Sequence, residues 1–295
     1  MCSSTRSRQW TCWRCCRDVS HRRSLIIPKR FAYLSLIVGL CFLAYAFVAG
    51  LPKGQTTPPL APAAFVEIRW QGPTPGLPTV PHYAPSLQIT EAAVLRHSGA
   101  WPLDRTWYEL PPPELPPEAV VVLLHGSGRD GLSMLEMWQE TGRKHGLLLV
   151  APNGGAWRHS ALGRRAVRAS AVAAALAYGL DPTGLFLFGH SDGAGIAQTL
   201  VAEAPPGQWR AAAVHAGYMP PQPIGPGRSA AALRIYLGDK DHIFALGPAR
   251  QSARAMAASG HPTELVVIPG HTHWFYDIGP QIAEDAWAWF ATSGR

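Results

Sequence analysis

Six short, mostly apolar runs recur along the chain from residue 119 onwards, and segments with helical spacing separate them. The runs are residues 120–124, 147–151, 185–188, 211–215, 234–237 and 265–268. The helical segments are residues 132–145, 164–178, 194–204, 251–259 and 281–291. Apolar runs without polar alternation are typical of strands buried on both faces, and their alternation with helices is typical of a parallel sheet. We therefore predict an α/β fold, with a mostly parallel sheet and helices on both faces.

The positive charge of the chain is concentrated at its N-terminus. The formal net charge is +7, but residues 1–30 hold eight of the 26 Lys and Arg residues and one of the 19 Asp and Glu residues. The rest of the chain is therefore balanced, with 18 residues of each sign. Because binding along a phosphate backbone needs a concentrated basic face, this distribution argues against nucleic acid as a partner.

Residues 31–50 form an uncharged stretch of 20 residues directly after Lys29 and Arg30. This length suffices to cross a bilayer as a helix, and the basic residues orient the N-terminus toward the cytoplasm. We expect a transmembrane anchor with the rest of the chain outside the cytoplasm. A signal peptide cleaved after the small residues Ala44 and Ala46 is the alternative, and the protein would then be secreted. All five cysteines lie at or before Cys41, so the exported part forms no disulfide bond.

Prolines dominate the segment that follows the apolar stretch. Residues 52–85 contain nine of them, which predicts an extended spacer that joins neither a sheet nor a helix. An early strand is expected at 106–110. The expected organisation is a basic cytoplasmic tail (1–30), an anchor or signal peptide (31–50), a proline-rich linker with an irregular segment (51–104) and a catalytic domain (105–295).

The stretch GHSDGAG follows the predicted strand 185–188 and precedes a predicted helix. A strand, a G-x-S-x-G sequence and a helix together indicate a nucleophile elbow, in which Ser191 occupies a sharp turn. Gly189 and Gly193 leave room for that turn. The helix N-terminus would point backbone N–H groups at the site, and the N–H of Asp192 is the first predicted oxyanion donor.

A nucleophilic serine needs a histidine base and a carboxylate that orients it. After the strand 234–237 two acids compete, and we favour Asp241 over Asp239. After the strand 265–268 two histidines compete, and we favour His273 over His271. A metal site made of both histidines and Asp241 is an alternative, but no fixed ligand motif supports it, and no metal is expected.

The loop HGSG, residues 125–128, follows the first buried strand. Its glycines let the backbone approach a substrate, and the N–H of Ser127 is the second predicted oxyanion donor. Gly126, Gly128 and Gly131 also match the spacing of a dinucleotide-binding motif. That motif requires an acidic residue about 20 residues further on, but the sequence there reads Ala-Pro-Asn. We therefore expect no NAD and no other cofactor.

Together, HGSG, GHSDG, LGDKD and HTHW make residues 105–291 resemble the α/β-hydrolase superfamily. Within it the sequence is similar to small exported esterases, the feruloyl-esterase-like and polyhydroxybutyrate-depolymerase-like proteins. The resemblance implies a triad of Ser191, Asp241 and His273 acting on a small-molecule or polymer ester. Because only 50 residues separate Ser191 from Asp241, no large cap domain is expected. The alternatives are a serine peptidase on the same fold and a binding module without catalysis.

Overall fold

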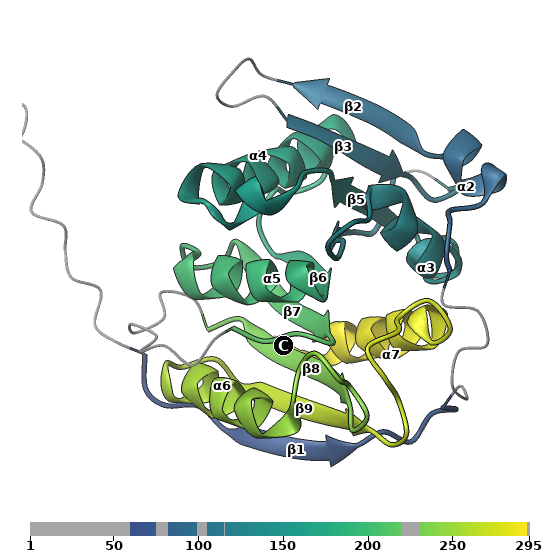
Figure 1. The fold of residues 1–295 in the computed structure, drawn as a ribbon. Helices are drawn as coiled ribbons and strands as arrows, with labels where there is room; N and C mark the ends of the chain where they lie inside the picture. The colour runs from purple at the N-terminus through teal and green to yellow at the C-terminus, as the bar shows by residue number, and fades with distance from the viewer. Residues whose placement is uncertain (1–59, 75–81, 99–104, 115, 220–229, 294–295) are drawn as a thin grey trace, which may run out of the picture. The chain divides into compact units, whose positions relative to one another are not determined.

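The computed structural model describes residues 60–74, 82–98, 105–114, 116–219 and 230–293 (Figure 1). The basic tail, the apolar stretch 31–50 and all five cysteines lie outside these residues. Within the described ranges, no helix combines the length and the apolar character needed to cross a bilayer. The expectations for the tail and the anchor therefore remain predictions.

A nine-stranded sheet forms the framework, in the order β1-β9-β8-β7-β6-β4-β5-β3-β2. The six strands from β4 to β9, together with β1, pair in parallel, whereas β3 is antiparallel to β5 and β2 is antiparallel to β3. This arrangement confirms the prediction of a mostly parallel sheet. The strands are β1 (Phe65–Arg69), β2 (Val94–Ser98), β3 (Arg105–Leu110), β4 (Ala119–Leu124), β5 (Leu147–Pro152), β6 (Leu185–His190), β7 (Trp209–His215), β8 (Ala232–Gly238) and β9 (Thr263–Ile268).

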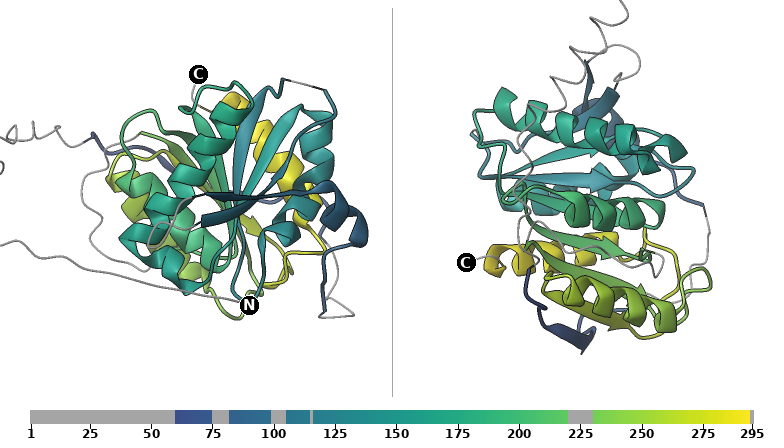
Figure 2. Two further views of the ribbon diagram at one scale, coloured as in Figure 1. Left: turned by 90° about the horizontal axis from the view of Figure 1, so that it is seen from above. Right: turned by 90° about the vertical axis from the view of Figure 1, so that its left-hand side faces the viewer.

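Helices cover both faces of the sheet, as Figures 1 and 2 show. The faces are separate because the side chains of each strand alternate between two buried clusters. In β4, Val120, Val122 and Leu124 belong to one cluster, and Val121 and Leu123 belong to the other. The first cluster includes side chains of α4, α5 and α6, and the second includes those of α3 and α7. The helices are α2 (Leu87–Ala92), α3 (Gly131–Lys144), α4 (Ala161–Ala177), α5 (Asp192–Glu203), α6 (Leu246–Ala258) and α7 (Gly279–Thr292), with a 3₁₀ turn η1 (Ala156–His159).

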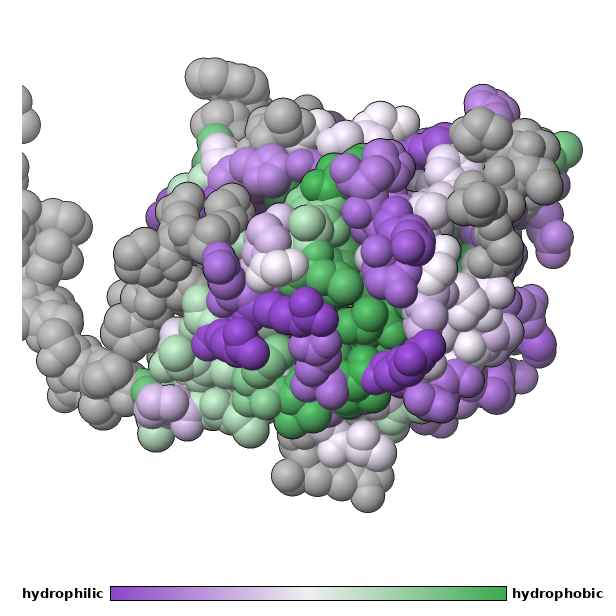
Figure 3. Space-filling view, turned by 60° about the horizontal axis from the view of Figure 1, so that its bottom comes forward, coloured by the Kyte–Doolittle hydropathy of each residue, from purple (hydrophilic) through white to green (hydrophobic). Residues whose placement is uncertain are grey.

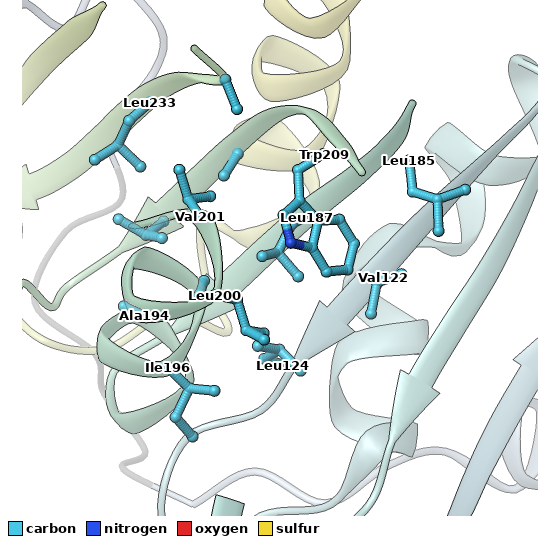
Figure 4. Packing of buried hydrophobic residues seen from close by; sticks show 14 of the residues in the cluster. Val122, Leu124, Leu185, Leu187, Ala194, Ile196, Leu200, Val201, Trp209 and Leu233 are labelled. Carbon is cyan, nitrogen blue, oxygen red and sulfur yellow. The ribbon is translucent and has the colours of Figure 1, made fainter. Parts of the chain in front are cut away.

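The first cluster joins the helix that follows Ser191 to the centre of the sheet. Figure 4 shows side chains of α5, such as Ile196 and Leu200, in the same cluster as Leu124 of β4 and Leu187 of β6. All four of these side chains are fully buried. Burial of a side chain of this size contributes about 1.5–3 kcal/mol to folding, so α5 is held firmly against β6, the strand that leads to Ser191.

Two strands lie in the part of the chain expected to be linker. The expectation that residues 52–85 join no sheet is wrong, because Phe65–Arg69 form β1 and pair with β9. These five residues contain no proline, so every N–H remains able to donate. Arg250 of α6 fixes the strand by two hydrogen bonds to Glu67, at 2.7 and 2.8 Å. β2 likewise lies within residues 51–104.

β1 forms one edge of the sheet, and its side chains are largely exposed; Val66, for example, is 48% exposed. Figure 3 turns the side of the molecule with β1 toward the viewer and shows hydrophobic surface bordered by hydrophilic side chains. β1 itself carries two charged residues, Glu67 and Arg69, and charged side chains on an edge strand are typical of edges that avoid pairing with another sheet.

The carboxyl ends of the central parallel strands meet at one edge of the sheet. The register pairs Leu124 with Gly189, His190 with His215, and Gly238 with Ile268. The loops after β4, β6, β8 and β9 therefore open side by side, which is where ligands bind in open α/β sheets. Every residue predicted for the site lies in one of these four loops or at the start of α5.

Candidate active site

Ser191 occupies a sharp turn between β6 and α5. Its backbone angles are φ 53° and ψ −116°, a conformation that costs a non-glycine residue about 1–3 kcal/mol and persists only when the surroundings enforce it. The N–H of Ser191 donates to the carbonyl of His215 at 2.9 Å, and its carbonyl accepts from Ala194 at 2.9 Å. These bonds fix the strained residue between β7 and the first turn of α5.

The flanking glycines are required by space. A Cβ atom on Gly189 would lie 2.3 Å from the carbonyl oxygen of Gly193, and one on Gly193 would lie 2.3 Å from the carbonyl oxygen of Leu124. Both distances are far shorter than any van der Waals contact. The two backbones can approach each other only because neither position carries a side chain.

His273, in the loop after β9, lies between Ser191 and Asp241. Its Nε2 is 2.9 Å from Oγ of Ser191, and its Nδ1 is 3.0 Å from Oδ2 of Asp241. An ionised carboxylate only accepts hydrogen bonds, so Nδ1 carries the proton and Nε2 is free to accept the serine hydroxyl. The three side chains therefore form a continuous line of hydrogen bonds from three separate loops.

The side chain of Asp241 is fully buried, yet its carboxyl group is kept ionised. Burial by itself raises the pKa of Asp241, but hydrogen bonds from His273 and from the N–H groups of Phe244 and Ile243 outweigh it and hold the pKa below its usual value. The two backbone bonds, at 2.9 and 2.8 Å, go to Oδ1 and leave Oδ2 for the histidine.

The two competing residues point elsewhere. Asp239 is exposed, and its carboxylate accepts the N–H of Gly270 at 2.7 Å, which ties the β8 and β9 loops together. His271 is buried, and its Nε2 lies 3.0 Å from Nε2 of His215. Of each predicted pair, the structure brings Asp241 and His273 to Ser191. His271 therefore does not join them in the alternative metal set, and the described residues contain no other group of three or more suitable ligands.

The loop after β4 lies against Ser191. A Cβ atom on Gly126 would lie 3.1 Å from Cβ of Ser191, so the adjacent Ser127 is close to the site. Ser127 is exposed, and Asp192 begins α5 directly after the nucleophile. Within the described part of the chain, no hydrogen bond from the backbone N–H of either residue is found. Among the described residues neither N–H group has an acceptor, which is what a donor to an oxyanion requires.

Solved structures of other proteins share this architecture. No protein-family model matches the chain, and no curated protein matches it. Among solved structures, esterase PE8 aligns with a TM-score of 0.52 and 21% identity, over 66% of this chain and 99% of that one. An S-formylglutathione hydrolase from Agrobacterium tumefaciens aligns with a TM-score of 0.56 and 15% identity, over 68% and 95%. An acetyl xylan esterase from Aspergillus awamori aligns with a TM-score of 0.55 and 16% identity, over 68% and 100%.

The chain has the α/β-hydrolase fold. Two residues of η1 that the sequence analysis missed contact Asp192 at the start of α5, and one of them also holds the β4 loop in place. Arg158 of η1 is 1% exposed, donates to the carbonyl of His125 at 3.0 Å and lies 3.5 Å from the carboxylate of Asp192. Nε2 of His159 lies 2.6 Å from the same carboxylate. Burial lowers the pKa of Arg158 to about 10, opposed by the charge of Asp192, so the guanidinium remains protonated.

No sequence signal marks Arg158, because an arginine in a short turn is ordinarily exposed. His125, directly after β4, contacts the next residue of the β4 loop. Its Nδ1 lies 2.8 Å from the carbonyl of Gly126, and burial, then the charge of Arg158, lowers its pKa to about 4. The ring is therefore neutral at physiological pH.

A hollow of about 500 Å³ opens between the β4 loop, the β5 loop and the start of α5, and Asp192, the neighbour of Ser191, lines it. Its lining is polar or glycine throughout: His125, Gly126, Ser127, Gly128, Arg129, Asp130, Asn153, Gly154, Gly155, Arg158 and Asp192. A larger hollow of about 730 Å³ lies among β1, α3 and α7 and shares no residue with it. The smaller hollow includes both predicted oxyanion donors, Ser127 and Asp192.

Proposed function

We propose that the protein is a serine hydrolase that cleaves carboxylic esters through an acyl-enzyme intermediate. The observation that carries the proposal is the hydrogen-bonded line from Ser191 through His273 to Asp241, with distances of 2.9 and 3.0 Å. A serine activated in this way by a base that a carboxylate orients is the basis of covalent acyl transfer.

In the proposed reaction, Oγ of Ser191 attacks the ester carbonyl carbon while Nε2 of His273 takes the hydroxyl proton. The N–H groups of Ser127 and Asp192 stabilise the negative oxygen of the tetrahedral intermediate. His273 then gives the proton to the leaving alcohol oxygen, and the C–O bond breaks to leave an acyl-serine. Water, deprotonated by His273, releases the acid and restores Ser191. Asp241 stabilises the imidazolium in both halves of the reaction.

Ester cleavage is preferred over peptide cleavage because the similar solved structures include proteins named as esterases. The same three side chains would serve a peptidase, which differs by the protonation of an amine leaving group. A direct comparison of an ester substrate with a peptide substrate therefore distinguishes an esterase from a peptidase.

Labelling with a fluorophosphonate probe tests the proposal, since the probe modifies activated serines only. We expect the folded wild-type protein to be labelled at Ser191 and Ser191→Ala to remain unlabelled. The wild type should hydrolyse p-nitrophenyl acetate and leave a peptide p-nitroanilide uncut. Absence of labelling would favour a binding module, and faster cleavage of the anilide would favour a peptidase.

We also propose that residues 31–50 anchor the protein in a membrane, with the catalytic part outside the cytoplasm. The support is the uncharged length of 20 residues after Lys29 and Arg30. Extraction of membranes at alkaline pH should leave the full-length protein in the pellet. A mature protein whose N-terminus lies shortly after Ala46 would instead identify a cleaved signal peptide.

A further inference from the structure

Three buried histidines form a chain directly behind the site. Nδ1 of His190 lies 3.0 Å from Nδ1 of His215, and Nε2 of His215 lies 3.0 Å from Nε2 of His271. The three residues are 5%, 0% and 3% exposed, respectively. None of them takes part in the proposed reaction, although each is a neighbour in the sequence or in space of a residue that does.

His215 is the middle of this chain and uses both of its ring nitrogens. A neutral imidazole has one N–H donor and one lone pair, so His215 donates to one neighbour and accepts from the other. Burial lowers the pKa of His190 to about 3 and that of His271 to about 4, and it lowers the pKa of His215 well below its usual value. The chain therefore consists of three neutral rings.

The row of three histidines connects the strand that leads to Ser191 with the loop that carries His273. His190 is the residue before the nucleophile, and the carbonyl of His215 accepts the N–H of Ser191 at 2.9 Å. His271 lies two residues before His273, in the same loop. The ring of His215 is thus the hydrogen-bonding link between the strand that presents the serine and the loop that presents its base.

Alternate residues of the loop after β9 contact these histidines or Ser191. The ring of Phe275, which is fully buried, lies 4.8 Å from that of His190 and 5.0 Å from that of His215, measured between centroids. His271 hydrogen-bonds to His215, and His273 reaches Ser191. Residues 271, 273 and 275 thus all face β6 or β7. The position of His273 therefore depends on His271 and Phe275, which lie two residues before and two residues after it.

From this arrangement we infer that His215 is a positioning residue, which sets the distance between His273 and Ser191 through its ring contacts with His190 and His271. This inference rests on the proposed function, because it concerns the geometry of the proposed base. A displacement of about 1 Å in a reacting group can lower a rate by as much as about 100-fold. The inferred role therefore predicts a loss of kcat, while KM stays unchanged because other loops form the hollow beside Ser191.

The test compares His215→Phe with His261→Phe in the full-length protein. Phenylalanine keeps an aromatic ring at position 215 and removes both ring hydrogen bonds, while the carbonyl that holds Ser191 remains. His261 is the matched control: it is fully buried, and its Nδ1–H donates one hydrogen bond, to the carbonyl of Ala231 at 3.0 Å. It lies before the start of β9, at the opposite end of that strand from His273. Circular dichroism and thermal unfolding show whether each variant is folded.

We expect folded His215→Phe to lose about tenfold to 100-fold in kcat, and in the rate of fluorophosphonate labelling, with KM within about twofold of the wild type. His261→Phe should keep the wild-type kcat while losing stability. His215→Asn and His215→Gln, whose amides can restore the contact with His190 or with His271, should recover part of the loss.

Wild-type kcat in folded His215→Phe, or an equal loss of kcat in His261→Phe, would overturn the inference. If His215→Phe does not fold, His271→Phe takes its place with the same expected loss and the same overturning result. A wild-type protein that is not labelled at Ser191 would instead defeat the proposed function, so the two failures are distinguishable.

Discussion

The ring of Phe244 lies nearly parallel to the imidazole of His273, with an interplanar angle of 21° and 5.6 Å between the centroids. The backbone N–H of the same phenylalanine donates to Asp241 at 2.9 Å. One residue of the β8 loop thus packs on the proposed base and hydrogen-bonds to the carboxylate that orients it. The geometry of the proposed triad therefore depends on the loop backbone as well as on the three side chains.

The two histidines of the β9 loop should differ in the size of their effect. His273→Ala removes the proposed base and is expected to lower kcat by at least about 10³-fold. His271→Ala removes only the end of the buried histidine chain, and its loss should stay within about 100-fold. Ester hydrolysis under saturating substrate measures both. A larger loss in His271→Ala than in His273→Ala would reverse the assignment.

The two acids of the β8 loop offer a second matched pair. In Asp241→Asn the amide can present an N–H to His273 and favour the wrong ring tautomer, so kcat should fall by about 10⁴-fold. Asp239→Asn keeps an oxygen that can accept the N–H of Gly270 and should retain most of the activity. Steady-state kinetics with p-nitrophenyl acetate distinguish the two, and comparable losses would contradict the assignment of Asp241.

Glycines of the elbow should respond to alanine in opposite directions. In Gly193→Ala the new Cβ would lie 2.3 Å from a backbone oxygen of Leu124, so the variant should be strongly destabilised or fail to fold. In Gly195→Ala the nearest atom lies 4.0 Å away. Gly195 lies within α5, where alanine is favoured over glycine by about 0.5–1 kcal/mol, so this variant should be slightly stabilised. Urea unfolding measures both, and equal destabilisation would contradict the packing described here.

Stability should decline as the pH falls from about 6.5 toward 4. Burial holds the pKa of His125 and His271 at about 4 and that of His190 at about 3, whereas the same residues in the unfolded chain titrate near about 6.5. Between these values the unfolded chain binds protons that the folded chain does not, so acid favours unfolding.

Within that window, each such histidine lowers the free energy of unfolding by up to about 1.4 kcal/mol for each unit by which the pH falls. Above about pH 6.5 the ring is neutral in both the folded and the unfolded chain, so this loss of stability is absent. Urea unfolding at pH 7, 6 and 5 measures the slope. A variant such as His271→Phe, which removes one of these groups, should show a shallower slope. Constant stability between pH 7 and 5 would contradict the neutral state of the buried rings.

The central sheet was predictable because its strands repeat one strong pattern. Each of the six apolar runs corresponds to a strand from β4 to β9, with ends that differ by a few residues, since a strand buried on both faces needs an uninterrupted apolar run. β1 and β2 were missed because edge strands carry polar and exposed residues and have no such run. Prolines on both sides of β1 also masked its five residues.

The loops that carry the site residues were predictable, and the favoured member of each pair, Asp241 and His273, is the one that lies in line with Ser191. Sequence order placed two acids and two histidines in the correct loops, and only the backbone conformation of those loops decides which of each pair faces Ser191. Arg158 could not have been found, because its role depends on a carbonyl 33 residues away. The His215 ring offered a weak signal, as a polar residue that ends an otherwise apolar strand.

The pairing of β1 with β9 has a practical consequence for any shortened form of the protein. A fragment that starts at residue 105, where the sequence pattern alone places the beginning of the catalytic part, would lose both outermost strands. The backbone donors and acceptors of β9 and β3 would then face water as open templates for self-association. Such a fragment should be prone to aggregate even with Ser191, His273 and Asp241 intact, and insolubility would then report the missing strands rather than a defect in the site.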